Sequence, residues 1–173
     1  MTDAQEITLD TATPRDATLL ANLLELYIHD LSEAFPNIQL GADGRFGYER
    51  LPLYWSEPKR RYAFLIRCGT RVAGFALITR GSPASDDPDV FDVAEFFVLR
   101  RYRRSGVGRR AIVQVWDRFP GQWIVRVSEA NTGALPFWGR VIAEYTRGIA
   151  GESQRAGTSG AWRVFSFASQ AKR

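Results

Sequence analysis

The stretch from Glu95 to Val113 reads EFFVLRRYRRSGVGRRAIV, and it decides the fold. It predicts an apolar strand, then a short basic turn with Gly106 and Gly108, then an amphipathic helix. Such a turn points several backbone N–H groups at one spot, which also receives the positive end of the helix dipole. Glycine has no Cβ, so a ligand can approach this backbone closely. The turn is therefore a candidate phosphate site, and its positive charge comes from four arginines: Arg103, Arg104, Arg109 and Arg110.

Two nucleotide-binding motifs fit this turn less well. A P-loop would need Gly-Lys-Ser/Thr at a fixed distance after its first glycine, and the chain has none there. The dinucleotide fingerprint G-x-G-x-x-G/A is formally met by Gly106, Gly108 and Ala111. That fingerprint belongs near the start of its βαβ unit, whereas this turn lies past the middle of the chain. Glu129 stands near the distance of a ribose-binding carboxylate and keeps this alternative open.

The segment from Val98 to Gly108 resembles the acyl-CoA-binding motif of the GNAT N-acetyltransferase superfamily. That motif has the form Gln/Arg-x-x-Gly-x-Gly/Ala, which Arg103, Gly106 and Gly108 meet. A second block, NTGALPFW at 131–138, resembles the family's downstream Asn-x-x-Ala-x-x-Phe-Tyr segment and follows at the expected spacing. The resemblance implies an α+β fold over one domain, residues 1–173. Its mixed, mostly antiparallel central sheet would be flanked by helices, with a V-shaped splay between the two central parallel strands.

The resemblance also implies an acetyl-CoA-dependent N-acetyltransferase that moves an acetyl group to a primary amine in a ternary complex. Backbone N–H groups of the glycine turn would hold the pyrophosphate, and Val98 would expose backbone groups to the pantetheine arm. Asn131 would bind pantetheine or fix its loop, and a capping or turn role for it stays open. The implied cofactor-binding residues are Val98, Arg103, Arg104, Ser105, Gly106, Val107, Gly108, Arg109, Asn131, Phe137 and Trp138.

Glu95 is the candidate catalytic residue. It lies within FDVAEFFV, residues 91–98, where a carboxylate is costly to bury without a partner. Burial among aromatic side chains would raise its pKa toward neutrality, which suits a general base acting directly or through water. The alternative for Glu95 is a salt bridge or an exposed edge position. Asp92, at the entrance of the strand, is the weaker candidate base.

The chain departs from the family pattern at Trp138, where the family often has a tyrosine that protonates the leaving thiolate. Indole is not a useful proton donor, so we expect Trp138 to pack against the cofactor. Water is then the proton donor unless the fold brings Tyr145 near. His29, the one histidine, is expected to be a solvated residue at a helix end, and a role as base or as a wall of the acceptor site stays open. The acceptor itself is not specified by the sequence, and candidate walls of its site are Tyr27, Phe35, Tyr48, Tyr54 and Trp55.

Composition excludes several classes of protein. The 173 residues are 45% hydrophobic and 24% charged with a net charge of +4, typical of a globular domain. The one cysteine, Cys68, cannot form an internal disulfide and fits a reducing cytoplasm. The polar N-terminus and the lack of an 18-residue apolar run argue against a signal peptide and a membrane span. One Cys and one His exclude a zinc cluster, so no metal is expected.

The predicted order of elements is β-α-(α)-β-β-β-α-β-α-β-β. Periodicity and turn residues predict helices at 14–31, 108–119 and 132–140, with short helical turns within 35–57. Segment 147–160, rich in Gly and Ser, is predicted to be a mobile loop. The predicted strands are 7–11, 62–67, 71–79, 90–99, 123–127, 141–146 and 161–167.

Two rival functions remain at this level. One is a catalytically silent CoA-binding or regulatory module, which Trp138 at the tyrosine position favours. The other is a basic nucleic-acid-binding protein that uses the arginine cluster, although no recognised nucleic-acid motif accompanies it. We also expect the protein to be cytoplasmic and without membrane contact. Its oligomeric state is not specified by the sequence, and a homodimer is possible.

Overall fold

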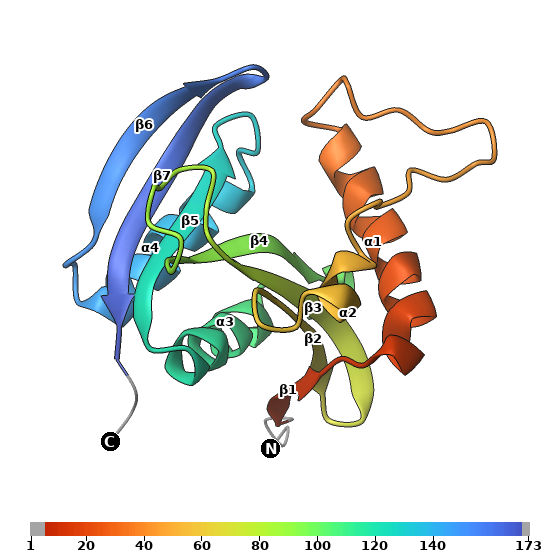
Figure 1. Ribbon diagram of the computed structural model, residues 1–173, viewed down its shortest axis with the longest axis horizontal. Helices are drawn as coiled ribbons and strands as arrows, with labels where there is room; N and C mark the ends of the chain where they lie inside the picture. Colours follow the sequence, from red (N-terminus) through yellow and green to blue (C-terminus); the bar gives the residue numbers. More distant parts are fainter. Residues whose placement is uncertain (1–5, 171–173) are drawn as a thin grey trace.

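The computed structural model describes residues 6–170 and forms one seven-stranded sheet beside four α-helices (Figure 1). The strand order is β1-β2-β3-β4-β5-β7-β6, and every neighbouring pair is antiparallel except β4 and β5. The strands are β1 (Ile7–Thr11), β2 (Arg61–Cys68), β3 (Arg71–Arg80), β4 (Phe91–Val98), β5 (Gly121–Ser128), β6 (Gly151–Gly157) and β7 (Gly160–Ser169). The helices are α1 (Ala17–Ser32), α2 (Leu53–Ser56), α3 (Val107–Arg118) and α4 (Ala134–Thr146). The predicted α+β class and the mixed sheet are confirmed, and the order of elements is as predicted up to α4.

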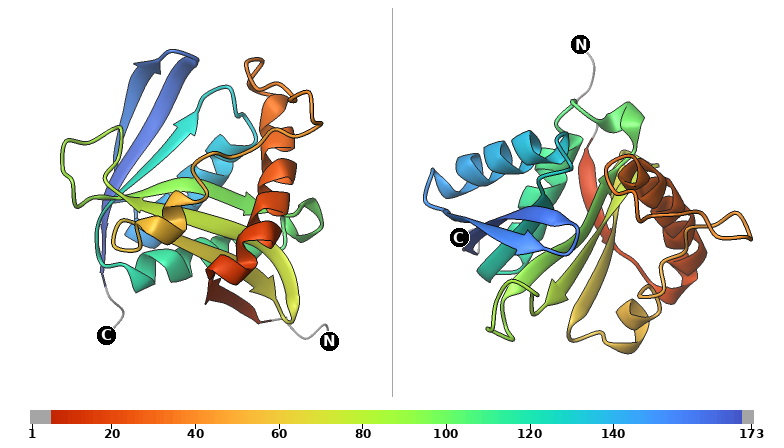
Figure 2. Two further views of the ribbon diagram at one scale, coloured as in Figure 1. Left: turned by 45° about the vertical axis from the view of Figure 1, so that its right-hand side comes forward. Right: turned by 90° about the horizontal axis from the view of Figure 1, so that it is seen from above.

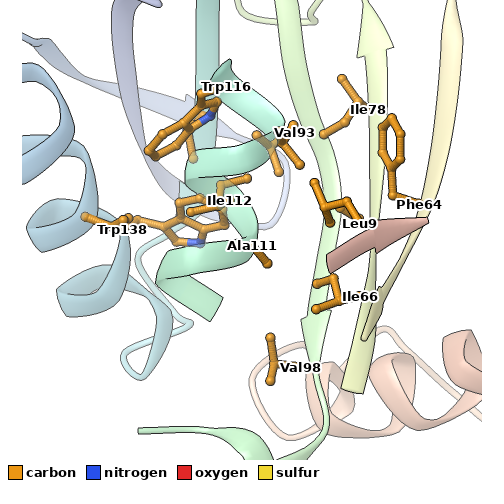
Figure 3. Close-up of a cluster of buried hydrophobic side chains, with 14 of the residues drawn as sticks. Leu9, Phe64, Ile66, Ile78, Val93, Val98, Ala111, Ile112, Trp116 and Trp138 are labelled. Atoms are coloured by element: carbon orange, nitrogen blue, oxygen red, sulfur yellow. The ribbon is translucent and has the colours of Figure 1, made fainter. Parts of the chain in front are cut away.

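Helices cover both faces of the sheet (Figures 1 and 2). Each face has its own cluster of buried hydrophobic side chains. Helices α3 and α4 pack on one face, where Ile112, Trp116 and Trp138 are buried against strand residues (Figure 3). Helices α1 and α2 pack on the other face, where Leu20 and Tyr54 belong to the second core. We call these the α3/α4 face and the α1 face.

The helix predicted at 14–31 begins in the structure as a 3₁₀ turn that continues into α1 at Ala17. Pro14–Asp16 form a short 3₁₀ turn, and the Thr13 N–H donates to the Asp16 carboxylate at 2.8 Å. Leu20, Leu23 and Leu24 then recur at helical spacing and are buried against the sheet. The helix thus lies across the α1 face with its polar side in solvent.

Strand β4 contains a bulge that decides which face Glu95 occupies. Glu95 lies opposite Leu77 of β3 and Val93 lies opposite Ile78, so Ala94 is an extra residue in β4. Without the bulge, Val93 and Glu95 would share a face, because side chains alternate along a strand. The bulge shifts this alternation, so that Val93 joins the α3/α4 core while Glu95 lies on the α1 face.

The parallel strands β4 and β5 separate soon after they meet. Their pairing is confined to Phe91 with Trp123 and Asp92 with Ile124, although both strands continue for several residues. The predicted V-shaped splay is therefore present. It leaves the β5-facing side of β4 free of strand partners over residues 93–98, at the end of β4 that leads into the glycine turn.

Two sequence predictions near the C-terminus were wrong. Residues 141–146 are not a strand but the second half of α4, because Trp138, Val141 and Ile142 recur at helical spacing and face the core. The predicted loop 147–160 contains β6, in which every residue is exposed. A strand with no buried side has no apolar alternation by which the sequence could reveal it.

Candidate active site

The glycine turn presents free backbone donors to solvent. Arg104 and Gly106 have positive φ angles, 60° and 82°, which turn the chain sharply into α3. The Arg110 N–H donates to the Gly106 carbonyl at 3.0 Å as the first bond of the helix, so the N–H groups of residues 107–109 lie ahead of the helical ladder. Residues 103–106 are exposed. This is the geometry of a phosphate site at a helix N-terminus.

Two of the predicted arginines hold the turn in place. Arg103 donates from Nε to the Val98 carbonyl at 2.8 Å and from Nη2 to Asp30 at 2.6 Å, and Asp30 also binds Arg100. Arg109 pairs with Glu144 of α4 at 2.7 Å. These contacts connect the turn to β4, α1 and α4, while the backbone N–H groups and the exposed Arg104 remain at the surface of the turn.

Three of the predicted cofactor residues meet beside the turn. A Cβ placed on Gly108 would lie 3.4 Å from the Phe137 ring and 3.5 Å from Cγ2 of Val98. The structure thus brings together the end of β4, the first turn of α3 and the first turns of α4. Because Gly108 has no side chain, the first turn of α3 packs closely against Phe137 and Val98, and no side chain covers the turn backbone at this position.

Trp138 and Asn131 occupy other environments. Trp138 is buried, and its ring centroid lies 5.4 Å from Phe96 and 6.5 Å from Trp116 (Figure 3). It is therefore part of the α3/α4 core. Asn131 accepts the Ala134 N–H on its Oδ1 at 3.3 Å, which gives it the capping contact that the sequence left open.

Glu95 lies on the α1 face, where two phenols bind its carboxylate. Tyr27 of α1 donates to Oε2 at 2.7 Å, and Tyr48 of the α1–α2 connection donates to Oε1 at 3.1 Å. Burial raises the pKa of Glu95 above its usual range, while the two tyrosines and Arg126 act in the opposite direction. Burial next to Glu95 also raises the pKa of both tyrosines, which keeps them protonated as donors. Glu95 is thus neither salt-bridged nor at an exposed edge.

Asp92, the weaker candidate base, is fully buried in an ion pair. Arg126 of β5 donates to it from Nε at 2.8 Å and from Nη2 at 3.0 Å, and the Ser82 hydroxyl also donates to it. Burial alone would lower the pKa of Arg126, but Asp92 beside it raises the pKa overall. The pair bridges β4 and β5 where the two strands separate. Arg126 was not among the predicted site residues, and its one signal in the sequence is that it is a charged residue within the apolar strand 121–128.

The other candidates lie outside this cluster or at its edge. The Tyr145 hydroxyl donates to Asp117 at 3.1 Å, and Tyr145 lies seven residues beyond Trp138, about 10 Å further along α4. It is not placed to act at the splay. His29 is exposed, as expected of a helix-end residue. Glu129 binds Gln154 and Arg163, which removes it as a ribose ligand.

The candidate acceptor walls are partly brought together. Tyr27, Tyr48 and Tyr54 gather around Glu95, and burial raises the pKa of Tyr54 to about 12. Phe35 instead stacks on Trp162 of β7, with ring centroids 6.4 Å apart. The aromatic side chains of the connection between α1 and α2 therefore reach both β4 and β7 across the α1 face.

The chain matches the sequence model of the acetyltransferase (GNAT) family over residues 22–142. This match covers more than half of the sequence, and the protein belongs to the GNAT acetyltransferase family. No curated protein matches the chain in sequence.

Many solved structures share the fold. An acetyltransferase from Thermus thermophilus matches with a TM-score of 0.66 and 16% identity, over 95% of this chain and 98% of the other. Spermidine N-acetyltransferase from Vibrio cholerae, in complex with CoA and spermine, matches with a TM-score of 0.64 and 10% identity over 94% and 95%. A Salmonella typhimurium protein with its cofactor acetyl-CoA matches with a TM-score of 0.64 and 12% identity over 97% and 96%. At these identities the likeness concerns the fold.

Neither a metal cluster nor a membrane span is found among the described residues. Within residues 6–170, three or more His, Cys, Asp or Glu side chains do not gather in a way that could hold a metal ion. None of the helices in this part of the chain is both long enough and apolar enough to cross a membrane.

Proposed function

We propose that the protein transfers an acetyl group from acetyl-CoA to a primary amine, by direct attack of the amine within a ternary complex. The observation that carries this proposal is the shared position of the splay and the glycine turn. The β4–β5 splay leads directly to the N-terminus of α3, and Glu95 projects from the same stretch of β4 onto the α1 face. A phosphate cradle, an open strand side and a candidate base thus lie along one short segment.

The turn and its neighbours would hold the cofactor. Backbone N–H groups of Arg104 to Arg109, with Ser105 among them, would bind the pyrophosphate. The side of β4 that β5 leaves unpaired would bind the pantetheine arm by backbone hydrogen bonds, and the Val98 carbonyl at its end would be shared with Arg103, which already donates to it. Phe137 beside Gly108 would pack on that arm, whereas Arg103, Asn131 and the buried Trp138 would support the binding surface from behind. When bound, acetyl-CoA supplies an acetyl thioester at the splay.

Glu95 would act as the general base. An amine attacks only when it is neutral, so the ammonium form must lose a proton to a nearby acceptor. Burial raises the pKa of Glu95, which brings its basicity closer to the working pH than that of an exposed carboxylate. Cys68 is buried on β2, two strands from β4, so it is poorly placed to carry a covalent acyl group.

The leaving thiolate would take its proton from water. Trp138 stands where the family often has a tyrosine, and indole does not donate a proton at this pH. Tyr145 is held by Asp117 at the far end of α4. We place this function in the cytoplasm. The chain's single cysteine, Cys68, can form no internal disulfide, and proteins without disulfides are typical of that reducing compartment.

A catalytically silent CoA-binding module is the second candidate. Trp138 favours it, because the side chain that often donates a proton in the family is absent here. A nucleic-acid-binding role has less support, since ion pairs with acidic residues already occupy Arg100, Arg103 and Arg109.

Turnover with a panel of amines separates the enzyme from the silent module. The purified protein is incubated with acetyl-CoA and a polyamine, an amino acid, an aminoglycoside, a lysine peptide or a peptide with a free N-terminus, and released CoA thiol is measured. We expect release above the rate of hydrolysis with at least one class, and loss of that release in Glu95→Gln. CoA binding without turnover on every class would instead establish the silent module.

A further inference from the structure

The carboxylate of Glu95 is held from two separate segments of the chain. Tyr27 lies 68 residues before it and donates to one oxygen at 2.7 Å, and Tyr48 lies 47 residues before it and donates to the other at 3.1 Å. Each oxygen of a carboxylate has two lone-pair sites, so both oxygens keep capacity for a further proton or water. The two phenols therefore fix the carboxyl group without using up its basicity.

Glu25 supplies the contact that places Tyr48. Its carboxylate lies on α1 two residues before Tyr27 and accepts the N–H groups of Phe46 and Gly47, each at 2.8 Å. The Phe46 N–H most of all, then the Gly47 N–H and the Arg45 guanidinium 3.6 Å away, lower the pKa of Glu25 against the effect of burial, so it remains an anionic acceptor. Helix α1 thus contacts Glu95 directly through Tyr27 and indirectly through residues 46–48.

We propose that Glu25, Tyr27 and Tyr48 form a positioning network that orients the Glu95 carboxylate and favours its ionised form, a role that rests on Glu95 being the base of the proposed function. The network joins the base to the connection between α1 and α2, residues 33–52. Since this connection covers the α1 face beside Glu95, its conformation and the state of the base are coupled. Glu25 acts through Tyr48 and need not touch any reacting atom.

Other groups near Glu95 do not replace these two donors. Arg126 of β5 and Arg50 of the α1–α2 connection act on it through charge, and Tyr54 of α2 lies near enough to be influenced by it. Arg126 uses its Nε and one Nη to bind Asp92. The hydrogen bonds to the Glu95 oxygens come from the two tyrosines.

Removing one phenol hydroxyl should raise the pKa of Glu95. A hydrogen bond to an ionised group favours that form, so its loss stabilises the protonated acid, and the expected rise is about 1 pH unit for Tyr48→Phe or Tyr27→Phe. Glu25→Gln should give a rise of the same sign but no larger. Because Glu25 acts through Tyr48, adding Glu25→Gln to Tyr48→Phe should change the value little further.

The test is a carbon-13 NMR titration of the Glu95 side-chain carboxyl in the full protein, assigned by its loss in Glu95→Gln. Tyr145→Phe is the matched control, because Tyr145 also donates to a carboxylate, that of Asp117, at 3.1 Å in another part of the fold. Thermal unfolding of each variant shows that it is folded before it is titrated. The acidic limb of kcat/KM is measured in parallel with the best amine of the panel.

The network predicts that Tyr48→Phe and Glu25→Gln raise the Glu95 pKa non-additively while Tyr145→Phe leaves it unchanged. An unmoved Glu95 titration in Tyr48→Phe, or fully additive effects of Glu25→Gln and Tyr48→Phe, overturns the proposal. If the NMR value moves but no amine is acetylated, the network stands and the proposed function fails. If amines are acetylated and the NMR value does not move, the function stands and the network fails. If Tyr27→Phe does not fold, Tyr48→Phe and Glu25→Gln decide the outcome.

Discussion

Valine in place of Gly108 should abolish acetyl-CoA binding while the fold survives. Gly108 lies in the first turn of α3, where an added Cβ would sit 3.4 Å from the Phe137 ring and 3.5 Å from Cγ2 of Val98. These are near-ordinary contact distances, so alanine fits with little adjustment. The two further methyl groups of valine must press into this junction or lie over the N–H groups of the turn.

The size of the effect follows from the hydrogen bonds at stake. A hydrogen bond to a charged group contributes about 1.5–3 kcal/mol, so loss of two contacts to the pyrophosphate amounts to about 3–6 kcal/mol, or at least about 100-fold in Kd. The free energy of unfolding should change by only about 1 kcal/mol, because valine gains helix propensity over glycine and loses through tighter packing. Gly108→Ala should fall between the wild type and Gly108→Val in affinity.

Calorimetric titration with acetyl-CoA and thermal unfolding measure the two effects separately. Gly139→Val is the matched control, because Gly139 also lies within a helix, α4, and a Cβ there meets no atom within 4 Å. The control should bind acetyl-CoA like the wild type. Normal affinity in a folded Gly108→Val protein would refute the assignment of the cofactor site.

Three further outcomes are expected. Glu95→Gln should keep the affinity for acetyl-CoA and remove the acidic limb of the pH–rate profile. In the wild type that limb should lie above the usual pKa range of a glutamate, because burial raises the pKa of Glu95. An unchanged profile in Glu95→Gln would assign the role of base to another group. Trp138→Phe should lower the melting temperature and weaken acetyl-CoA binding, because the indole is buried beside Phe96. Turnover at saturating substrate should change only modestly. Intact binding with lost turnover would instead place the indole in the chemical step. Arg126→Met should lower the free energy of unfolding, measured by chemical denaturation, by about 3–5 kcal/mol, because it leaves the buried Asp92 carboxylate without its cation. A free energy of unfolding equal to that of the wild type would show that the ion pair between Arg126 and Asp92 does not stabilise the fold.

The sequence predicted those parts of the fold that depend on local pattern. Residues 95–113 gave the end of β4, the turn and α3 with boundaries close to those observed, because an apolar run, two glycines and an amphipathic repeat are all encoded within a few residues. The helix predicted at 14–31 was found for the same reason, and its first three residues form the 3₁₀ turn that precedes α1.

Where local propensity and packing differ, the prediction was wrong. Val141, Ile142 and Tyr145 are residue types that favour strands, yet their spacing places them on the buried side of α4. Strand β6 forms because it pairs with β7, and the pattern of its exposed residues does not predict this pairing.

The sequence predicted the individual segments that form the candidate site, but it did not predict the long-range contacts between them. Glu95 was recognised as a carboxylate in an apolar strand, but its face is set by the bulge at Ala94, which depends on the register with β3. Its partners Tyr27 and Tyr48, and the pairing of Asp92 with Arg126, join residues 34 to 68 positions apart. Such contacts arise only when the sheet is assembled.

A crystal structure of the protein with acetyl-CoA tests the central claim most directly. We expect the pyrophosphate within hydrogen-bonding distance of the backbone N–H groups of residues 104–109, the pantetheine arm along β4 in the splay, and the acetyl group accessible from the side of Glu95. A cofactor bound elsewhere on the molecule, or a splay that stays closed to it, would contradict the account.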